Sequence, residues 1–123
     1  MPKTRIVIYS ENDGAAPLIE WLDSLPTKVQ DKCIAKIELL QEKGHQLRRP
    51  HCDYLDDGIY ELRVRHGNVN YRILYCFCSG KMVLLSHGCT KGKEVPPKEI
   101  KMALKHKLSF ESDQKAHTYQ EEL

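Results

Sequence analysis

Residues 58–88, GIYELRVRHGNVNYRILYCFCSGKMVLLSHG, decide the fold, because apolar and polar side chains alternate along much of their length. A period of two is typical of strands that bury one face. Gly67-Asn68 and Ser79-Gly80 are two-residue turn signals. The stretch therefore predicts three antiparallel strands joined by tight hairpins.

The two turns also predict which residues pair across the strands. A two-residue loop at the first turn places Arg63 directly opposite Arg72, and the apolar rows of the two strands then match. The same rule applied to the second turn places His87 opposite Arg72. The sequence therefore predicts one row of Arg63, Arg72 and His87 across three neighbouring strands, on the face opposite the apolar row.

Helices are expected before and after these strands. Upstream, apolar residues recur at helical spacing in two consecutive segments, which predicts an amphipathic helical hairpin. Downstream, a third amphipathic segment follows a Lys- and Pro-containing loop. The expected elements are a strand at 4–9, a helix capped by Asn12 or Asp13, a helix from Pro26 to about Lys43 with Gly44 as its C-cap, a loop at 45–57 and a helix from about Pro97.

Together these elements predict one α+β domain with the order β-α-α-β-β-β-α and a small antiparallel sheet. The chain has 123 residues, which leaves little room for a second domain. The domain is expected to span residues 1–110. Residues 111–123 are polar and lack periodicity, so we expect a flexible C-terminal tail.

The formal net charge of +2 hides an uneven distribution of charge along the chain. Residues 60–107 hold ten Lys and Arg against three acidic residues, a net charge of +7, and the remainder carries a net charge of −5. Such a split indicates a local surface for a polyanion, although a solvated charged face explains the counts equally well.

Composition and motifs disfavour several other classes of protein. No apolar run approaches the roughly 18 residues of a membrane span, and the N-terminus lacks a signal-peptide stretch, so we expect a cytoplasmic protein. The five cysteines are an odd number without a C-x-x-C pair, which favours reduced thiols over disulfides or a zinc site. The sequence also lacks the phosphate-loop, dinucleotide, zinc-protease and hydrolase-elbow motifs.

The predicted row of Arg63, Arg72 and His87 suits a phosphate site. Like charges directly opposite each other destabilise a sheet, so the two arginines require a compensating anion. Arginine binds phosphate oxygens bidentately, and histidine transfers protons near neutral pH. With Lys91 and Lys93 on the following loop, the row fits RNA cleavage by attack of a 2′-hydroxyl on its phosphate. That chemistry needs no metal and no cofactor, and we expect neither.

Structural roles for the same residues remain open. Exposed strand arginines commonly pair with neighbouring acids, and a strand-end histidine can simply be hydrogen-bonded. Lys91 and Lys93 can be solvated loop residues. The acids expected within reach of the two arginines are Glu61, Asp56 and Asp57.

The chain carries, in order, the motifs Tyr60-Glu61-Leu62-Arg63, Tyr71-Arg72-Ile73-Leu74-Tyr75, Leu84-Leu85-Ser86-His87-Gly88, Lys91 and Pro97-x-Glu99-Ile100. Their order and spacing resemble the HigB-like branch of the RelE/ParE toxin superfamily, the phage-associated Gp49-like proteins. The similarity covers roughly residues 3–109. It implies a RelE-like fold, in which helices pack on a small antiparallel sheet.

The resemblance also implies an activity, namely a toxin of a bacterial type II toxin–antitoxin system that cuts mRNA in the ribosomal A site. Arg63 and Arg72 would hold and stabilise the scissile phosphate, and His87 would transfer a proton. The expected partners are mRNA, the ribosome and an antitoxin, a small helix-turn-helix DNA-binding protein. The residues expected to contact RNA or the ribosome are Arg65, Lys91, Lys93 and Lys98.

The chain departs from the family pattern in the loop that follows His87. Relatives carry an aromatic residue after His-Gly and a denser Lys/Thr run before the proline, where this chain has Cys89 and residues 92–96. The last helix has no tyrosine, so a C-terminal tyrosine base is not supported.

Two other functions stay open. ParE-like members of the superfamily bind and poison DNA gyrase, and an inactive phage-derived protein would only bind its antitoxin. Replacing Arg72 by Ala separates these classes, because a nuclease should lose toxicity while it still binds antitoxin.

Overall fold

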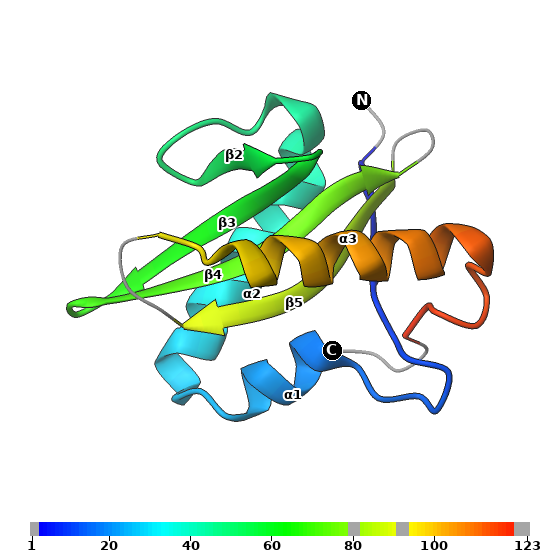
Figure 1. Ribbon diagram of the computed structural model, residues 1–123. Coiled ribbons are helices and arrows are strands. Elements are labelled where there is room, and N and C mark those ends of the chain that lie inside the picture. The colour runs from blue at the N-terminus through cyan, green and yellow to red at the C-terminus, as the bar shows by residue number, and fades with distance from the viewer. Residues whose placement is uncertain (1–2, 79–81, 91–93, 120–123) are drawn as a thin grey trace.

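The computed structural model describes residues 3–78, 82–90 and 94–119. In this part of the chain a five-stranded sheet lies between helices on its two faces (Figure 1). The elements are β1 (Arg5–Ile8), α1 (Pro17–Asp23), α2 (Thr27–Lys43), a short 3₁₀ turn (Gly44–Gln46), β2 (Cys52–Asp56), β3 (Ile59–His66), β4 (Val69–Cys78), β5 (Met82–Thr90) and α3 (Pro97–Ser112).

The strand order in the sheet is β1-β5-β4-β3-β2. The antiparallel meander of β3, β4 and β5 confirms the prediction from residues 58–88. β1, however, pairs in parallel with β5, so the fold is α+β with a mixed sheet and not with an antiparallel one. Parallel partners need a long connection, and here α1, α2 and the other three strands all lie between β1 and β5 in the sequence.

β2 lies in the segment expected to be a loop, and it pairs with β3 in antiparallel orientation. The turn between them has φ values of +53° at Asp57 and +82° at Gly58. A type I′ hairpin turn requires positive φ at both central positions. The observed order is therefore β-α-α-β-β-β-β-α, one strand more than predicted, and the RelE-like order is not confirmed.

Each face of the sheet has its own hydrophobic core. α1 and α2 pack on one face, and α3 lies across the other, as Figure 1 shows. The predicted apolar row of β4 faces α1 and α2, where Ile73 and Tyr75 are almost fully buried. The other row of β4 faces α3, and its Cys76 and Cys78 share one core. All five cysteines of the chain are buried and free.

The register between β3 and β4 is the predicted one. His66 pairs with Val69, and Arg63 lies directly opposite Arg72. Gly67 takes a φ of +61°, which the first position of a two-residue hairpin turn requires. The local turn and the alternation of side chains thus fix this register together.

The predicted register between β4 and β5 is wrong. Cys78 pairs with Met82, so three residues connect these strands in place of two, and the expected turn at Ser79-Gly80 lies outside the described residues. A bulge then shifts the pairing again, and His87 lies opposite Leu74 instead of Arg72. The longer connection shifts the register by one residue, which alone would turn His87 to the opposite face of the sheet. The bulge adds a second shift of one residue, so His87 lies on the α3 face again.

The helix boundaries follow the proline and glycine signals. α1 begins at Pro17 with Ala16 as its N-cap, so the predicted cap at Asn12 or Asp13 is wrong. Asp13 instead accepts a hydrogen bond of 2.9 Å from the backbone N–H of Ala15, within the loop. Gly44 ends α2 with a φ of +53°, and α3 begins at Pro97, both as predicted.

The residues after α3 return to the edge of the sheet beside β1. The backbone N–H of Ser10 donates to the carbonyl of His117, and the N–H of Tyr119 donates to the carbonyl of Ile8. His117 is itself buried. These contacts attach residues 117–119, the described end of the predicted tail, to the domain. No helix among the described residues is long and apolar enough to cross a membrane.

Candidate functional site

A cleft of about 590 Å³ opens at the outer edge of β3. β2 pairs with β3 only as far as Leu62, so the remainder of this edge borders the cleft. Its walls come from α2, from the segment that precedes β2, and from strands β3 and β4. Five of its lining side chains are basic: Lys36, His51, Arg63, Arg65 and Arg72.

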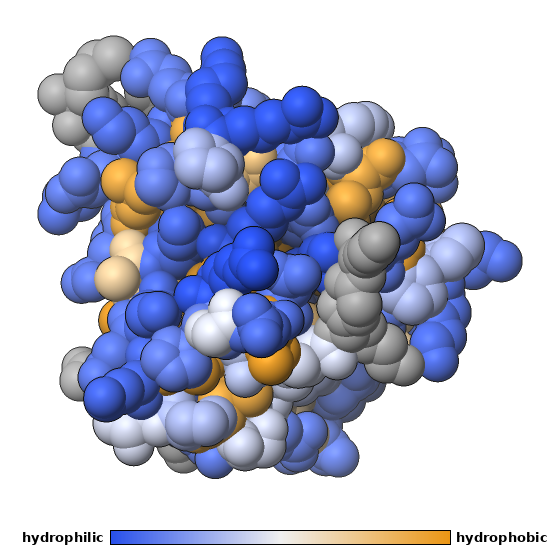
Figure 2. Space-filling model, turned by 90° about the vertical axis from the view of Figure 1, so that its left-hand side faces the viewer, coloured by the Kyte–Doolittle hydropathy of each residue, from blue (hydrophilic) through white to orange (hydrophobic). Residues whose placement is uncertain are grey.

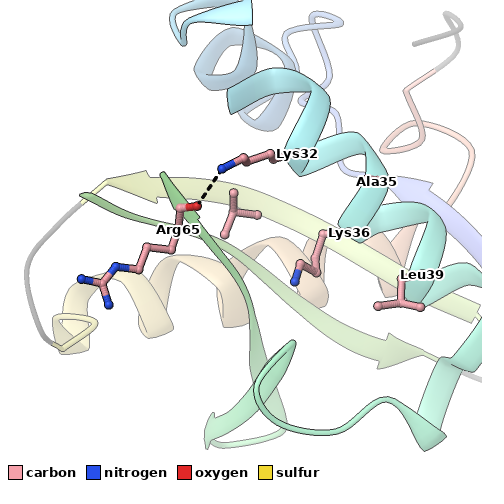
Figure 3. A pocket seen from close by; sticks show the side chains of 6 residues that line it. Lys32, Ala35, Lys36, Leu39 and Arg65 are labelled. Atoms are coloured by element: carbon pink, nitrogen blue, oxygen red, sulfur yellow. Dashed lines mark hydrogen bonds between the residues drawn. The ribbon is translucent and has the colours of Figure 1, made fainter. Parts of the chain in front are cut away.

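A second, smaller hollow of about 320 Å³ adjoins this cleft between α2 and β3. Lys32 and Lys36 lie one turn apart on α2 and face β3 (Figure 3). Lys32 Nζ donates a hydrogen bond of 3.3 Å to the carbonyl of Arg65. Figure 2 looks onto the end of the molecule that carries the β3–β4 hairpin, and hydrophilic residues dominate that face. The basic cleft therefore extends along α2.

The two predicted arginines lie side by side on the α3 face of the sheet. The side chain of Arg63 is 43% exposed, while that of Arg72 is 8% exposed. Both line the cleft. The structure thus brings together the pair that the hairpin register predicts, with one guanidinium accessible and the other largely buried.

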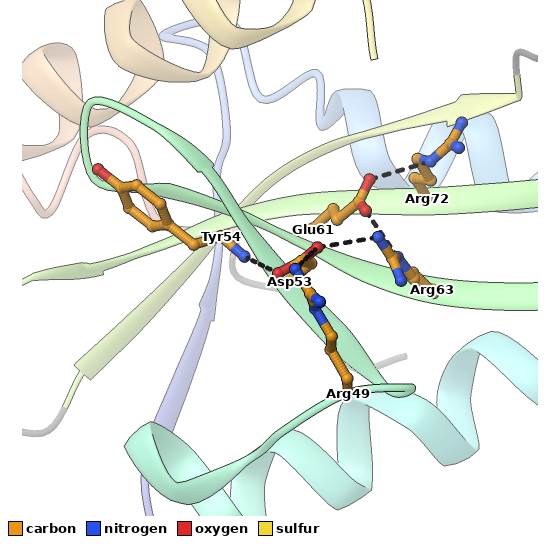
Figure 4. Close-up of polar contacts among 6 residues, drawn as sticks. All are labelled: Arg49, Asp53, Tyr54, Glu61, Arg63 and Arg72. Carbon is orange, nitrogen blue, oxygen red and sulfur yellow. Dashed lines mark hydrogen bonds and ion pairs between the residues drawn. The ribbon is translucent and has the colours of Figure 1, made fainter. Parts of the chain in front are cut away.

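Glu61 holds both guanidiniums, as Figure 4 shows. Its Oε1 accepts from Arg72 Nε at 2.9 Å, and its Oε2 accepts from Arg63 Nε at 2.7 Å. The carboxylate is almost fully buried, since Glu61 is only 3% exposed. One acid therefore compensates two cations that would otherwise repel each other across the strands. This structural pairing was one of the open alternatives in the sequence.

Asp53 of β2 extends this network toward the loop. It accepts from Arg63 and from Arg49, each at 3.0 Å, so the guanidinium of Arg63 is held from two directions (Figure 4). The hydrogen bond from Arg49 lowers the pKa of Asp53, and the bond to Glu61 raises the pKa of Arg63. The three arginines and two acids leave the network with a formal charge of +1. The acids orient the arginines without cancelling their charge.

His87 does not lie in the row with the two arginines. It is 4% exposed and faces α3, with Nδ1 at 2.8 Å from Ser86 Oγ and Nε2 at 3.7 Å from Glu99 Oε1. Burial lowers the pKa of His87, and Glu99 acts in the opposite direction. His87 is not one of the residues that line the cleft.

The residues expected to contact RNA are spread over two parts of the surface. Arg65 is exposed, lines the cleft and donates from Nε to the carbonyl of Gly67 at 3.4 Å. Lys98 is exposed in the first turn of α3 and lines a different cleft of about 580 Å³. Lys91 and Lys93 lie outside the described residues.

Sequence reasoning missed two basic residues of the cleft, Lys36 and His51. Lys36 Nζ lies 3.0 Å from His51 Nδ1, although 15 residues separate them. Burial lowers the pKa of Lys36. Lys36 lies on an amphipathic helix and His51 in an expected loop, so neither carries a local signal. Only the packing of α2 beside the loop brings them together.

Comparison with protein families supports one assignment. The family model described as phage-derived protein Gp49-like (DUF891) matches residues 20–107. This range contains every residue of the basic cleft and the whole β3–β4–β5 meander. A search of curated proteins found no match to the chain.

Proposed function

The chain belongs to the family of phage-derived Gp49-like proteins (DUF891), and we propose that it is the toxin of a bacterial type II toxin–antitoxin module. In this proposal it acts in the cytoplasm as an endoribonuclease that cuts mRNA on the translating ribosome. A separately encoded antitoxin, a small helix-turn-helix protein, neutralises it. The resemblance to the HigB-like branch of the RelE/ParE superfamily supports the same assignment. The main observation in support of this function is the basic cleft, in which Arg63 lies opposite Arg72.

The cleft suits cleavage by an internal 2′-hydroxyl. Attack of that oxygen on the neighbouring phosphate concentrates negative charge on a crowded phosphorane, and preorganised cations stabilise it. Arg63 presents a partly exposed guanidinium whose orientation is fixed by Glu61 and Asp53. Arg72 supplies a second guanidinium from the next strand. Fixed arginines lose little conformational freedom when they bind a phosphate.

Other basic side chains would hold the RNA backbone. Arg65 lines the same cleft, and Lys32 lies in the adjoining hollow between α2 and β3. Lys98, with Lys91 and Lys93, is proposed to contact RNA or the ribosome outside the cleft. His87 was expected to transfer a proton, but it is buried under α3. The proposal therefore rests on the two arginines and assigns proton transfer to a group within the cleft.

The test adds purified protein to a translating extract and maps breaks in the mRNA by primer extension. We expect cuts that appear only during translation. Arg63→Ala should slow cleavage by about 100-fold, the usual loss when one charge-stabilising donor is removed. Arg5→Ala, an exposed arginine on β1, is the matched control and should cleave normally.

Two results would contradict this function. Intact message in the presence of the wild-type protein would exclude an mRNA nuclease, and a DNA gyrase supercoiling assay would then test the ParE-like alternative. Cleavage by Arg63→Ala at the wild-type rate would exclude the arginine pair as the phosphate site. Arg63 is preferred to Arg72 for this test, because truncating buried Arg72 would also remove the partner of Oε1 of the buried Glu61 carboxylate.

A further inference from the structure

His51 is held in the cleft by three contacts from three parts of the chain. Its carbonyl accepts the backbone N–H of Arg63 at 2.8 Å, and its own N–H donates to the carbonyl of Arg48 at 3.0 Å. Its ring is held by Lys36, whose Nζ lies 3.0 Å from Nδ1. The first contact makes His51 the direct backbone neighbour of the arginine proposed to bind the phosphate. A side chain fixed in this way is oriented before any ligand arrives.

Proton transfer in the cleft has few candidates. The three arginines stay protonated at any physiological pH. The remaining lining residues apart from Lys36 and His51 are Pro50, Val64, Asn70 and Tyr71. Of these only Tyr71 has a side-chain hydroxyl, and it is 9% exposed and packs edge-on against Trp21. No carboxylate is among the described residues that line the cleft.

We propose that Lys36 and His51 form a proton relay that protonates the leaving 5′-oxygen during RNA cleavage in this cleft. The inference rests on the proposed function and deepens it. His51 is the residue that contacts the reacting oxygen, and Lys36 is a positioning residue that acts through it. Neither the family match nor the sequence motifs assign a role to this pair.

The geometry fixes the direction of the relay. The ammonium of Lys36 has only donors, so Nδ1 of His51 must accept, and the proton of the neutral imidazole then lies on Nε2. As the bond between phosphorus and the 5′-oxygen breaks, Nε2 gives its proton to that oxygen and Nδ1 receives one from Lys36. The 2′-oxygen bonds to phosphorus and releases its proton to water. The products are a 2′,3′-cyclic phosphate and a 5′-hydroxyl, with neutral Lys36 reprotonated from solvent.

The environment of Lys36 favours the release of its proton. Burial against the sheet lowers the pKa of Lys36, although a contribution from Cys52 acts in the opposite direction. The charged groups that face the pair across the cleft are Arg63 and Arg65 of β3 and Arg72 of β4, all cationic.

The first experiment measures single-turnover cleavage of a ribosome-bound message by wild-type protein, His51→Ala and Lys36→Met. We expect a loss of about 100-fold or more for His51→Ala, the range of general acid catalysis, and a smaller loss for Lys36→Met. Added imidazole should restore part of the activity of His51→Ala only. The matched controls are His45→Gln, at an exposed histidine of the 3₁₀ turn, and Lys43→Met, at an exposed lysine of α2.

The second experiment separates acid catalysis from a structural role. A message with a 5′-bridging sulfur at the cleavage site has a leaving group that needs no proton. His51→Ala and Lys36→Met should cleave it at the wild-type rate, and a misfolded variant would not. A wild-type protein that leaves every message intact removes the proposed function and the relay with it. The relay alone is overturned if the wild-type protein cleaves and His51→Ala cleaves both messages as fast as the wild-type protein does. It is also overturned if His51→Ala is slowed by the same factor on both messages.

Discussion

Glu61 is the residue on which the geometry of the basic cleft depends. Its side chain is 4% exposed, and its carboxylate accepts from Nε of both Arg63 and Arg72. Glu61→Gln keeps the shape but removes the charge between the two neighbouring guanidiniums, and only Asp53 would still pair with Arg63. Breaking a buried ion pair from one side costs about 3–5 kcal/mol. We expect a loss of that order in the free energy of unfolding, measured by urea denaturation.

A second substitution extends this prediction to a double-mutant cycle. Glu61→Gln with Arg72→Gln removes both members of the buried pair, so no uncompensated charge remains between them. We expect the double variant to be more stable than Glu61→Gln alone, because removing both partners costs less than removing one. Equal stability of Glu61→Gln and the wild-type protein would mean that the arginines do not need this acid.

His106 makes the stability of the fold dependent on pH. It lies on α3 with Nδ1 at 2.7 Å from Ser86 Oγ, and burial lowers its pKa from 6.5 to about 4. Between these two values the unfolded chain takes up a proton that the folded chain does not. The free energy of unfolding should therefore fall as the pH drops from about 6.5 to about 4, by about 3 kcal/mol.

Urea unfolding at several pH values checks this dependence. His106→Gln should show a shallower loss between pH 6.5 and 4 than the wild-type protein. Some dependence should remain, because burial also lowers the pKa of His87. His45→Gln, which changes an exposed histidine, should keep the wild-type slope. A His106→Gln curve parallel to that of the wild-type protein would refute the assignment.

At the scale of elements, the ring of Trp21 on α1 packs closely against Gly88 of β5. A Cβ on Gly88 would overlap the ring of Trp21, whose Nε1 donates to Thr90 Oγ1 at 2.9 Å. Gly88→Ala should therefore push α1 away from the sheet and lower the free energy of unfolding by about 1–3 kcal/mol. Trp21 is the only tryptophan in the sequence, so its fluorescence reports this change directly.

Gly67→Ala is a useful comparison, because no atom lies within 4 Å of a Cβ at that position. Its φ of +61° makes the substitution unfavourable for the backbone alone, so the protein should be destabilised without a change in Trp21 emission. An unchanged spectrum and unchanged stability in Gly88→Ala would show that Trp21 does not pack on β5 as described.

The elements that the sequence predicted correctly are those with local signals. The β3–β4 register follows from a two-residue turn and from alternation on both strands, and it places Arg63 opposite Arg72. β2 was missed although Asp57-Gly58 is a strong hairpin signal, because its short strand CDYLD lacks an apolar alternation. The displaced position of His87 depends on a three-residue connection and a bulge, and neither has a composition signature.

The rest of the site could not be predicted, because it depends on tertiary contacts. β1 pairs with β5 from the opposite end of the chain, and α2 brings Lys36 to His51. Glu61 was considered as one of several acids, but nothing in the sequence indicated that it would bind both arginines. Local patterns define rows within a hairpin, whereas clefts form where separate elements meet.

At the scale of the whole molecule, folding gathers cations from both parts of the charge split into one cleft. Lys36 comes from the acidic part of the chain, and Arg63, Arg65 and Arg72 come from the basic part. A surface that neutralises phosphates should bind RNA with strong salt dependence. We expect the logarithm of the association constant for a short single-stranded RNA to fall linearly with the logarithm of salt concentration.

Arg65 provides the sharpest version of this prediction, because its side chain is exposed and its Nε donates only a long hydrogen bond of 3.4 Å to the carbonyl of Gly67. Arg65→Ala should weaken binding by a similar factor for all RNA sequences and reduce the salt slope by about 0.7, the value of one phosphate contact. Fluorescence anisotropy between 50 and 200 mM salt, a range over which such contacts weaken measurably, gives both quantities. Arg5→Ala removes the same charge from β1, at the far edge of the sheet, and should leave the slope unchanged. If both variants shift the slope equally, binding follows net charge and not the cleft.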